Sequence, residues 1–283
     1  MLPKLPDFYV NDVIQRALQE DINYIDVTTD LLELPKKSYA NLIAKEDGVL
    51  SGIDVAETVF TFFSWCGFEK LFKDGDSIKA GDVIAELEGH TAHMLKAERT
   101  ALNILQHMSG IATYTRACVD AVAGTGAAIA DTRKTLPGLR GLQKYAVLCG
   151  GGTNHRFNLS SAAMLKDNHI DAYGSITKAV EALRSRAGHM VQIEVEVRGL
   201  QQLKEAVKVG ANVIMLDNMS IDMMKEAVAI VGAGSSRPVL ESSGNITLEN
   251  IRSVAETGVD IISIGALTHS VRALDISLKW KTH

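Results

Sequence analysis

The chain has 283 residues, 46% hydrophobic and 22% charged, so it is long enough for one large domain and a smaller one, each with its own core. A formal net charge of -5 argues against a broad nucleic-acid-binding face, and no run approaches the ~20 apolar residues that a membrane span needs. Three widely spaced cysteines without a C-x-x-C pair indicate neither a disulfide framework nor a zinc site. We therefore expect a cytoplasmic protein that binds neither nucleic acid nor membrane.

The first part of the chain mixes helix and short strands. An apolar stripe at helical spacing after Asp7 predicts a first helix, and short apolar runs broken by turns over 40–90 predict small antiparallel strands. The run 75–88 resembles the hairpin of lipoyl or biotinyl carrier domains. Because Gly-His-Thr occupies 89–91, where those domains carry a modifiable lysine, a structural sandwich is favoured over a carrier.

A second helical pattern covers 92–117 and predicts a helix that bridges two domains. Arg99 lies inside it, next to Glu98 and one turn before Asn103. From spacing alone, Arg99 is a solvated or ion-paired helix charge.

After Gly126, apolar runs alternate with amphipathic runs of helical length. Continuous apolar strands of this kind predict parallel pairing with right-handed crossovers, in a βα barrel or in an open doubly wound sheet. Polar groups follow nearly every strand rather than one switch point, which favours an incomplete barrel of about six strands. The predicted strands are 127–130, 162–165, 191–197, 213–216, 239–240 and 261–264.

Positive charge is concentrated in residues 131–169, which contain six Lys/Arg and two Asp, a local charge of +4. Glycines in the same stretch let the backbone approach a ligand. Arginine offers bidentate geometry to carboxylate or phosphate and lysine a point charge, so cations at two successive strand ends predict a ligand with more than one anionic group. The candidates are Arg133, Lys134, His155, Arg156 and Lys166.

Acidic residues follow the next two strands. Glu196 and Asp217 could hold Mg²⁺, hydrogen-bond sugar hydroxyls, stabilise a cationic sugar carbon, or only pair with the basic residues. Glu194 is two residues earlier and points the same way as Glu196, so the pattern does not decide between them.

Two glycine turns come at the last strand ends. Ser243, Gly244 and Asn245 precede a predicted helix, and Gly265 repeats the arrangement one strand later. Such turns offer backbone N–H groups to phosphate, and barrels commonly bind phosphate at their last two loops. The sequence therefore predicts a phosphosugar site.

Taken together, these strings resemble the quinolinate phosphoribosyltransferase family, also called nicotinate-nucleotide pyrophosphorylase (carboxylating). The resemblance runs from the first helix to the end and rests on Asp131-Thr132-Arg133-Lys134-Thr135, Asn154-His155-Arg156, Leu165-Lys166-Asp167-Asn168-His169, Leu216-Asp217-Asn218, Glu241-Ser242-Ser243-Gly244 and Gly265-Ala266-Leu267-Thr268-His269. It implies that quinolinate and phosphoribosyl pyrophosphate give nicotinate mononucleotide, pyrophosphate and carbon dioxide in NAD biosynthesis.

The resemblance also implies an architecture. Residues 1–112 would form an N-terminal α/β sandwich with the bridging helix, and 113–268 a partly open α/β barrel of the type II phosphoribosyltransferase kind. Residues 269–283 would form a C-terminal helix that returns to the first domain. The expected assembly is a homodimer or a higher oligomer, in which Arg99 reaches across the interface into the partner's site.

Roles carried over by position are also implied by the resemblance. The pyridine carboxylates would be held by Arg133, His155, Arg156 and Lys166. Lys134 and Lys166 would reach the sugar phosphates, and Glu196, favoured over Glu194, would serve the ribose and Mg²⁺ together with Asp217. The catalytic set is thus Lys134, Lys166, Glu196 and Asp217, and the cup for the 5'-phosphate is Ser243, Gly244, Asn245 and Gly265.

One stretch departs from the family pattern as we expect it. Ser161 stands where an Asp is usual and Met164 where a bulkier aliphatic is usual, which affects the support of the Lys166 strand. Two alternatives to the main function are a ModD-like phosphoribosyltransferase of other specificity and a non-catalytic phosphosugar sensor. The complete Lys-Asp-Asn-His block at 166–169 argues against the ModD-like enzyme. The two acids Glu196 and Asp217 argue against the sensor.

Overall fold

The computed structural model describes residues 2–232 and 237–281. By its internal contacts the chain divides into two compact units. The first unit comprises Met1–Arg116, Thr135–Gly151 and Ala266–His283, and the second Ala117–Lys134 and Gly152–Gly265. The predicted boundary at residue 112 lies inside one long helix, α3 (Thr91–Ala121).

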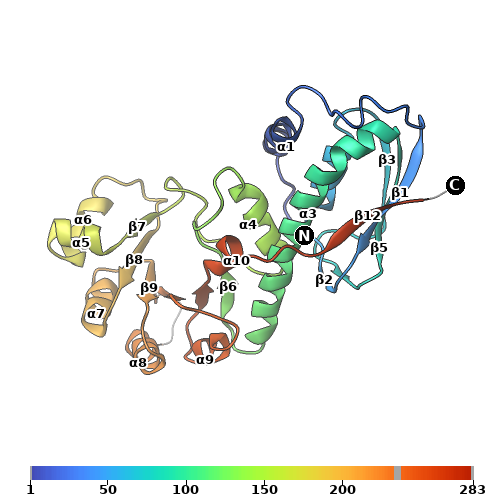
Figure 1. The fold of residues 1–283 in the computed structure, drawn as a ribbon. Coiled ribbons are helices and arrows are strands. Elements are labelled where there is room, and N and C mark those ends of the chain that lie inside the picture. Colours follow the sequence, from blue (N-terminus) through green and yellow to red (C-terminus); the bar gives the residue numbers. More distant parts are fainter. Residues whose placement is uncertain (1, 233–236, 282–283) are drawn as a thin grey trace. The chain divides into compact units, whose positions relative to one another are not determined.

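The first unit is built on a four-stranded antiparallel sheet in the order β12-β1-β5-β3. Its strands are β1 (Ser38–Ala44), β3 (Cys66–Lys70), β5 (Val83–Gly89) and β12 (Ile276–Trp280), which lie side by side in Figure 1. A smaller antiparallel pair joins β2 (Gly48–Val49) and β4 (Ser77–Ile78). The helices α1 (Asp7–Asp21), α2 (Ile53–Phe60), α4 (Arg140–Cys149) and α10 (Ala266–His269) complete this unit. The predicted first helix is confirmed.

The expected C-terminal helix over 269–283 is wrong. Helix α10 ends at His269, and the following residues reach β12, which pairs antiparallel with β1 in the register Ala40↔Trp280 to Ala44↔Ile276. The reason is visible in the residues: Ile276 and Leu278 are buried while Ser277 and Lys279 between and after them are not, a period of two that fits a strand on one face of a sheet. The segment does return to the first part of the chain, as a strand.

The second unit contains a six-stranded parallel sheet in the order β6-β11-β10-β9-β8-β7. The strands are β6 (Ala128–Ala130), β7 (Ala163–Leu165), β8 (Ile193–Val197), β9 (Val213–Asp217), β10 (Val239–Ser243) and β11 (Ile261–Ser263). Within the described ranges β6 and β7 are not paired, so the sheet stays open between its first two strands. Strands β7 to β11 lie next to one another in chain order, and β6 pairs with β11, so the strand order never reverses as it does in a doubly wound sheet. The predicted incomplete barrel is therefore confirmed.

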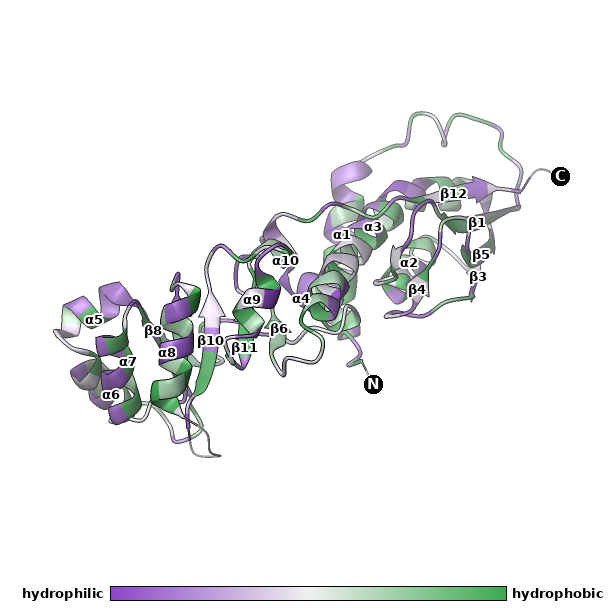
Figure 2. Ribbon diagram, turned by 90° about the horizontal axis from the view of Figure 1, so that it is seen from below, coloured by the Kyte–Doolittle hydropathy of each residue, from purple (hydrophilic) through white to green (hydrophobic). Residues whose placement is uncertain are grey.

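Helices alternate with these strands. They are α5 (Asp167–Tyr173), α6 (Ile176–Arg184), α7 (Leu200–Lys208), α8 (Ile221–Val231) and α9 (Ile251–Ala255). In Figure 2 α7 and α8 carry both hydrophilic and hydrophobic residues, as expected for helices that cover a sheet. Nearly every residue of β8 and the three central residues of β9 are buried, as in a parallel strand covered on both faces of its sheet. No helix within the described residues has both the length and the apolar character to cross a membrane.

Candidate active site

A cavity of about 300 Å³ opens at the carboxyl ends of the parallel strands. All of its lining residues belong to the second unit. They are Thr132, Arg133, Lys134, His155, Arg156, Met164, Lys166, Glu196, Met215, Asp217 and Ser243. The cavity thus collects the predicted cations, the two predicted acids and one residue of the predicted phosphate turn at one place.

The cationic side of the cavity is built from the segments after β6 and before β7. The turn after β6 is held by Thr132, whose Oγ1 accepts the Lys134 N–H at 3.0 Å. The guanidinium of Arg156 donates to the Ala162 carbonyl at 2.9 Å and lies 3.6 Å from the Met164 sulfur. Burial, and then the nearby charge of Arg133, lower the pKa of Arg156, which remains a cation because arginine starts so high. Two guanidinium groups close together repel each other, so an anion bound between them is stabilised.

A buried aspartate fixes the loop that carries these cations. Asp131, fully buried at the end of the β6 segment, accepts the backbone N–H of His155 at 2.9 Å and the side-chain amide of Asn154 at 2.7 Å. The loop also pairs with β6 through a parallel bridge between Ala130 and Thr153. The Asn-His-Arg block is therefore held in a set geometry before any ligand binds.

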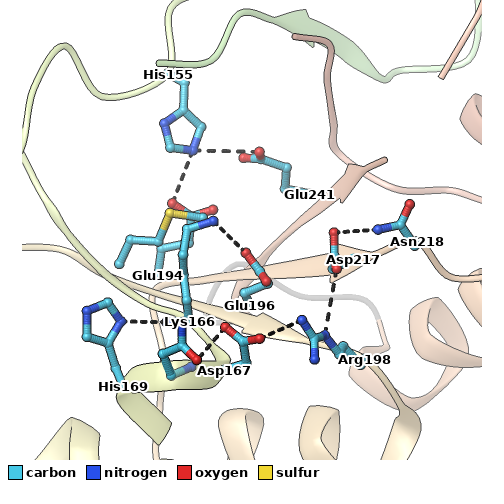
Figure 3. Close-up of polar contacts among 12 residues, drawn as sticks. His155, Lys166, Asp167, His169, Glu194, Glu196, Arg198, Asp217, Asn218 and Glu241 are labelled. Carbon is cyan, nitrogen blue, oxygen red and sulfur yellow. Dashed lines mark hydrogen bonds and ion pairs between the residues drawn. The ribbon is translucent and has the colours of Figure 1, made fainter. Parts of the chain in front are cut away.

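Three ionisable side chains converge where His155, which lines the cavity, meets two glutamates that do not. His155 Nε2 lies 3.1 Å from Glu194 Oε2 and 3.6 Å from Glu241 Oε1, and Figure 3 shows both carboxylates pointing toward the ring. Burial, and then the charge of Glu194, raise the pKa of Glu241 to about 7. Ligand atoms of the three residues lie within 4.8 Å of one another, so they form the one group in the described part of the chain with the geometry of a possible metal site.

At the rim, Lys166 and Glu196 form an ion pair of 2.9 Å. The lysine side chain is 49% exposed and the glutamate 9%, so the lysine can leave the pair while the acid stays in place. The two glutamates of β8 are thereby distinguished: Glu196 lines the cavity, and Glu194 lies one step deeper on the same face.

The Lys-Asp-Asn-His block forms the junction of β7 and α5. The Lys166 N–H donates to Nδ1 of His169 at 3.1 Å, and the Asn168 N–H donates to the carboxylate of Asp167 at 2.8 Å. Asp167 also pairs with Arg198 at 2.7 Å. These contacts set the direction in which the Lys166 side chain leaves the strand.

The predicted phosphate turn follows β10 in an unusual backbone conformation. Gly244 has φ +104, and a Cβ there would lie 2.2 Å from Oδ1 of Asn218. Asn218 and Asn245 themselves have positive φ, and the Asn245 amide donates to Asn218 Oδ1 at 3.1 Å. Because Ser243 pairs with Ser263, Gly244 and Gly265 follow the carboxyl ends of neighbouring strands.

Two other predicted positions lie away from the cavity lining. Arg99 is exposed on α3, in the part of that helix that belongs to the first unit. Ser161 closes a short turn, in which its hydroxyl donates to Asn158 Oδ1 at 3.1 Å and accepts the Asn158 N–H at 3.3 Å. A serine thus supplies local support at the position before β7.

Sequence reasoning missed several residues of this site. Met164 and Met215 line the cavity and could pack on a flat ring, but apolar strand residues give no signal of facing a ligand. Arg198 lies 3.9 Å from Asp217 and was hidden among ordinary surface charges. The predicted strand 239–240 stops before Glu241, because the apolar run ends at Leu240, whereas β10 continues to Ser243 and buries Glu241.

The chain matches known proteins over nearly its whole length. The family model for the quinolinate phosphoribosyl transferase C-terminal domain matches residues 111–279, and that for the N-terminal domain matches 26–109. The chain is 45% identical over 273 residues to the nicotinate-nucleotide pyrophosphorylase (carboxylating) of Mycobacterium leprae, covering 94% of this chain and 95% of that one. NadC from Streptococcus pyogenes has a TM-score of 0.93 at 42% identity, covering 99% of this chain and 100% of the other. The nicotinate-nucleotide pyrophosphorylase of Francisella tularensis gives 0.92 at 38% identity, with 98% of each chain covered.

Proposed function

Because the chain belongs to the quinolinate phosphoribosyltransferase family, we propose that it transfers a phosphoribosyl group from phosphoribosyl pyrophosphate to quinolinate. The products are nicotinate mononucleotide, pyrophosphate and carbon dioxide. The observation that carries the proposal is the cavity itself, a space the size of a small ligand whose lining combines basic and acidic side chains. They are Arg133, Arg156, Lys166, Glu196 and Asp217.

Quinolinate is a flat ring with two adjacent carboxylates, and the cationic side of the cavity suits it. The guanidinium groups of Arg133 and Arg156 can each take a carboxylate in bidentate geometry. Met164 and Met215 offer polarizable apolar surface for the ring. Charge and shape together favour a dicarboxylate over a neutral pyridine.

The sugar donor is assigned to the rim. Lys134 and Lys166 supply positive charge for the pyrophosphate. The turn of Ser243, Gly244 and Asn245, with Gly265 after the next strand, offers backbone N–H groups for the 5'-phosphate. Binding exchanges the Lys166–Glu196 pair for contacts with the donor, which frees the Glu196 carboxylate toward the ribose.

Glu196 and Asp217 fit a magnesium ion. Both are carboxylates on neighbouring parallel strands, both line the cavity, and hard oxygen donors are what Mg²⁺ prefers. When bound there with the donor, Mg²⁺ would neutralise charge on the pyrophosphate leaving group. The two acids are the residues that would hold it.

The chemistry then needs no nucleophilic side chain. The pyridine nitrogen attacks the anomeric carbon of the ribose, and the bond from that carbon to pyrophosphate breaks. Positive charge that develops on the sugar is stabilised by Glu196 and Asp217, while Lys134 and Lys166 bind the departing pyrophosphate. The bond between the neighbouring ring carbon and its carboxylate then breaks, and carbon dioxide leaves. The electron pair stays on that ring carbon, where the positive charge of the quaternary nitrogen stabilises it, and a proton then adds to the carbon.

The proposal includes a homodimer in which Arg99 completes the partner's site. In support, Arg99 is exposed on α3, and large apolar side chains such as Phe8 and Tyr24 are 80% and 92% exposed in the same unit. The buried, unbridged Cys66, Cys118 and Cys149 support a reducing, cytoplasmic setting for the enzyme.

Mixed dimers test the shared site. Arg99→Ala and Lys166→Ala subunits are each expected to be nearly inactive alone. After unfolding and refolding together, one site in each mixed dimer has both residues intact, so about a quarter of wild-type activity should return. No recovery, despite mixed dimers seen by native mass spectrometry, would show that Arg99 serves its own subunit. Wild-type activity of Arg99→Ala alone would show that Arg99 serves neither site.

The direct test of the activity is incubation of the purified protein with quinolinate, phosphoribosyl pyrophosphate and Mg²⁺. Nicotinate mononucleotide, pyrophosphate and carbon dioxide should appear in equal amounts. A Lys166→Ala sample serves as the background control. Absence of nicotinate mononucleotide above that background would refute the proposal.

A further inference from the structure

The two glutamates beside His155 have no part in the mechanism above. Glu194 is 6% exposed and Glu241 3% exposed. Among the residues the structure describes, Oε1 of each has no hydrogen-bond partner. A buried carboxylate oxygen without a hydrogen-bond donor lowers the stability of the fold, so we expect these two glutamates to have a role in the adjacent binding site.

The hydrogen bonds of His155 define its protonation. The backbone N–H of Arg156 donates to Nδ1 of His155 at 2.8 Å, so Nδ1 carries a lone pair and no hydrogen. The ring hydrogen is then on Nε2, which donates to Glu194 Oε2 at 3.1 Å. His155 is therefore a neutral Nε2–H imidazole with both nitrogens engaged.

This tautomer argues against a metal ion in the cluster. A metal bound by His155, Glu194 and Glu241 would need the Nε2 lone pair, while Nδ1 already accepts a hydrogen bond. The ring would have to become an imidazolate. A hydrogen-bonded support fits the contacts better.

We propose that Glu194 and Glu241 are positioning residues that orient Arg156 through His155. Glu194 accepts the Nε2–H and Glu241 confines the same edge of the ring, so the ring is held in one orientation. The opposite nitrogen, Nδ1, holds the Arg156 backbone N–H. The inference rests on the proposed function, in which Arg156 binds a carboxylate of quinolinate.

The rest of Arg156 is fixed as well. Its guanidinium donates to the Ala162 carbonyl at 2.9 Å and contacts the Met164 sulfur at 3.6 Å. With both ends of the residue held, a shift of the His155 ring moves the backbone from which the guanidinium projects. Positioning of this kind affects ligand binding even though neither acid touches the ligand.

Charge supports the same role. Because burial and the charge of Glu194 raise the pKa of Glu241 to about 7, Glu241 is about half ionised near neutral pH. That charge offsets part of the repulsion between Arg133 and Arg156 while the cavity is empty, and leaves net positive charge for the dicarboxylate.

Steady-state kinetics of Glu194→Ala, with Glu194→Gln as the conservative variant, test the positioning role. Glu194→Ala should raise the quinolinate KM about tenfold, the effect of losing one oriented hydrogen bond, and leave the phosphoribosyl pyrophosphate KM within about twofold. Glu194→Gln keeps an acceptor oxygen and should recover most of the loss. Glu226→Ala, an exposed acid on α8, is the matched control and should change neither constant.

An unchanged quinolinate KM, an equal rise in both constants, or a Gln variant as poor as the Ala variant would each overturn the proposal. Long-range ¹H–¹⁵N spectra of the wild type, assigned with His155→Asn, provide a test that needs no folded acid variant. The Nε2–H tautomer is expected at neutral pH, and an imidazolium or Nδ1–H ring contradicts the proposal. This readout stands even if wild-type protein shows no activity with quinolinate, so failure of the proposed function remains distinguishable.

A zinc titration tests the competing metal site. We expect Zn²⁺ binding, if present, to depend on Asp217 and Glu196 at the rim. Stoichiometric binding that is lost in Glu241→Gln and retained in Asp217→Asn would overturn the positioning role in favour of a metal.

Discussion

Two layers of charged residues lie at different depths of the same barrel. The deep layer consists of His155, Glu194 and Glu241, and the rim layer of Lys166, Glu196 and Asp217. In the deep layer every side chain is at most 11% exposed, whereas at the rim Glu196 is 9% exposed and its partner Lys166 is 49% exposed. Deep contacts therefore stay fixed, and rim contacts can be exchanged for a ligand.

Strand β8 contributes to both layers. Glu194 and Glu196 are two residues apart on the same face of the strand. Glu194 contacts a buried histidine, whereas Glu196 pairs with a solvent-accessible lysine. The two glutamates are 7% and 9% exposed, so the exposure of the partner, more than the burial or type of the acid, separates a positioning acid from a reacting acid.

The largest effect is expected at the rim. Lys166→Ala removes a cation from the leaving-group side, and we expect kcat/KM to fall about 10²–10³-fold, as for loss of one preorganised electrostatic contact. The thermal midpoint should change little, because the lysine is half exposed. The control is Lys178→Ala, an exposed lysine on α6. A fall that accompanies a large loss of stability would contradict a direct role.

The next effect concerns the phosphate turn. Gly244→Ala puts a Cβ at φ +104 and within 2.2 Å of Asn218 Oδ1, so the turn must shift. The KM for phosphoribosyl pyrophosphate should rise about tenfold or more, with the quinolinate KM changed less. Gly188→Ala, where no atom lies within 4 Å of the added Cβ, is the control. A rise in the quinolinate KM alone would assign the turn to the wrong substrate.

A smaller effect tests the deep layer through stability. The pKa of Glu241 is raised to about 7 by burial and by Glu194, so between its unfolded value and pH 7 the folded state holds a proton that the unfolded state lacks. Folding stability contributed by this group is thus greatest at low pH and falls as pH rises toward 7.

Glu241→Gln cannot titrate and should lose this pH dependence. As pH rises from about 5 to 7, the free energy of unfolding of the wild type should fall relative to that of the variant by on the order of 1–2 kcal/mol. Urea unfolding at a series of pH values measures it. A difference that does not change with pH would show that Glu241 titrates normally in the folded protein.

The smallest effect is expected from Arg198→Ala. Arg198 pairs with Asp167 at 2.7 Å and lies 3.9 Å from Asp217, but its side chain is 58% exposed. Such a pair contributes about 0–1 kcal/mol and is screened by salt. Thermal unfolding at low and high salt should therefore differ little between variant and wild type. A loss comparable to that of a deep variant would remove the distinction between the layers.

Much of the second unit could be predicted from the sequence, because continuous apolar runs are specific for covered parallel strands. Once the strands are predicted, so are the residues at their carboxyl ends, and four of these residues line one cavity. They are Arg133, Lys166, Glu196 and Asp217. The assignment of quinolinate came only from family resemblance, since charge alone indicates no more than an anion.

Other features could not be predicted, for physical reasons. The burial of Glu241 could not be predicted, because a buried glutamate is indistinguishable in sequence from an exposed one. Its partner His155 is 86 positions earlier, and only the fold brings the two together. The helix expected over 269–283 came from the resemblance, and the 5 residues of Ile276–Trp280 are too few for a period of two to indicate a strand against it. Both cases depend on pairing between segments distant in sequence.

The central claim is that the cationic side of the cavity selects a dicarboxylate. Its most direct test is the ratio of kcat/KM for quinolinate to that for nicotinate, which has one carboxylate fewer, each with phosphoribosyl pyrophosphate and Mg²⁺. The account predicts a ratio of about 10² or more, since one unmatched pair of guanidinium and carboxylate should cost ~3 kcal/mol. Equal use of the two acids, or preference for nicotinate, would contradict it.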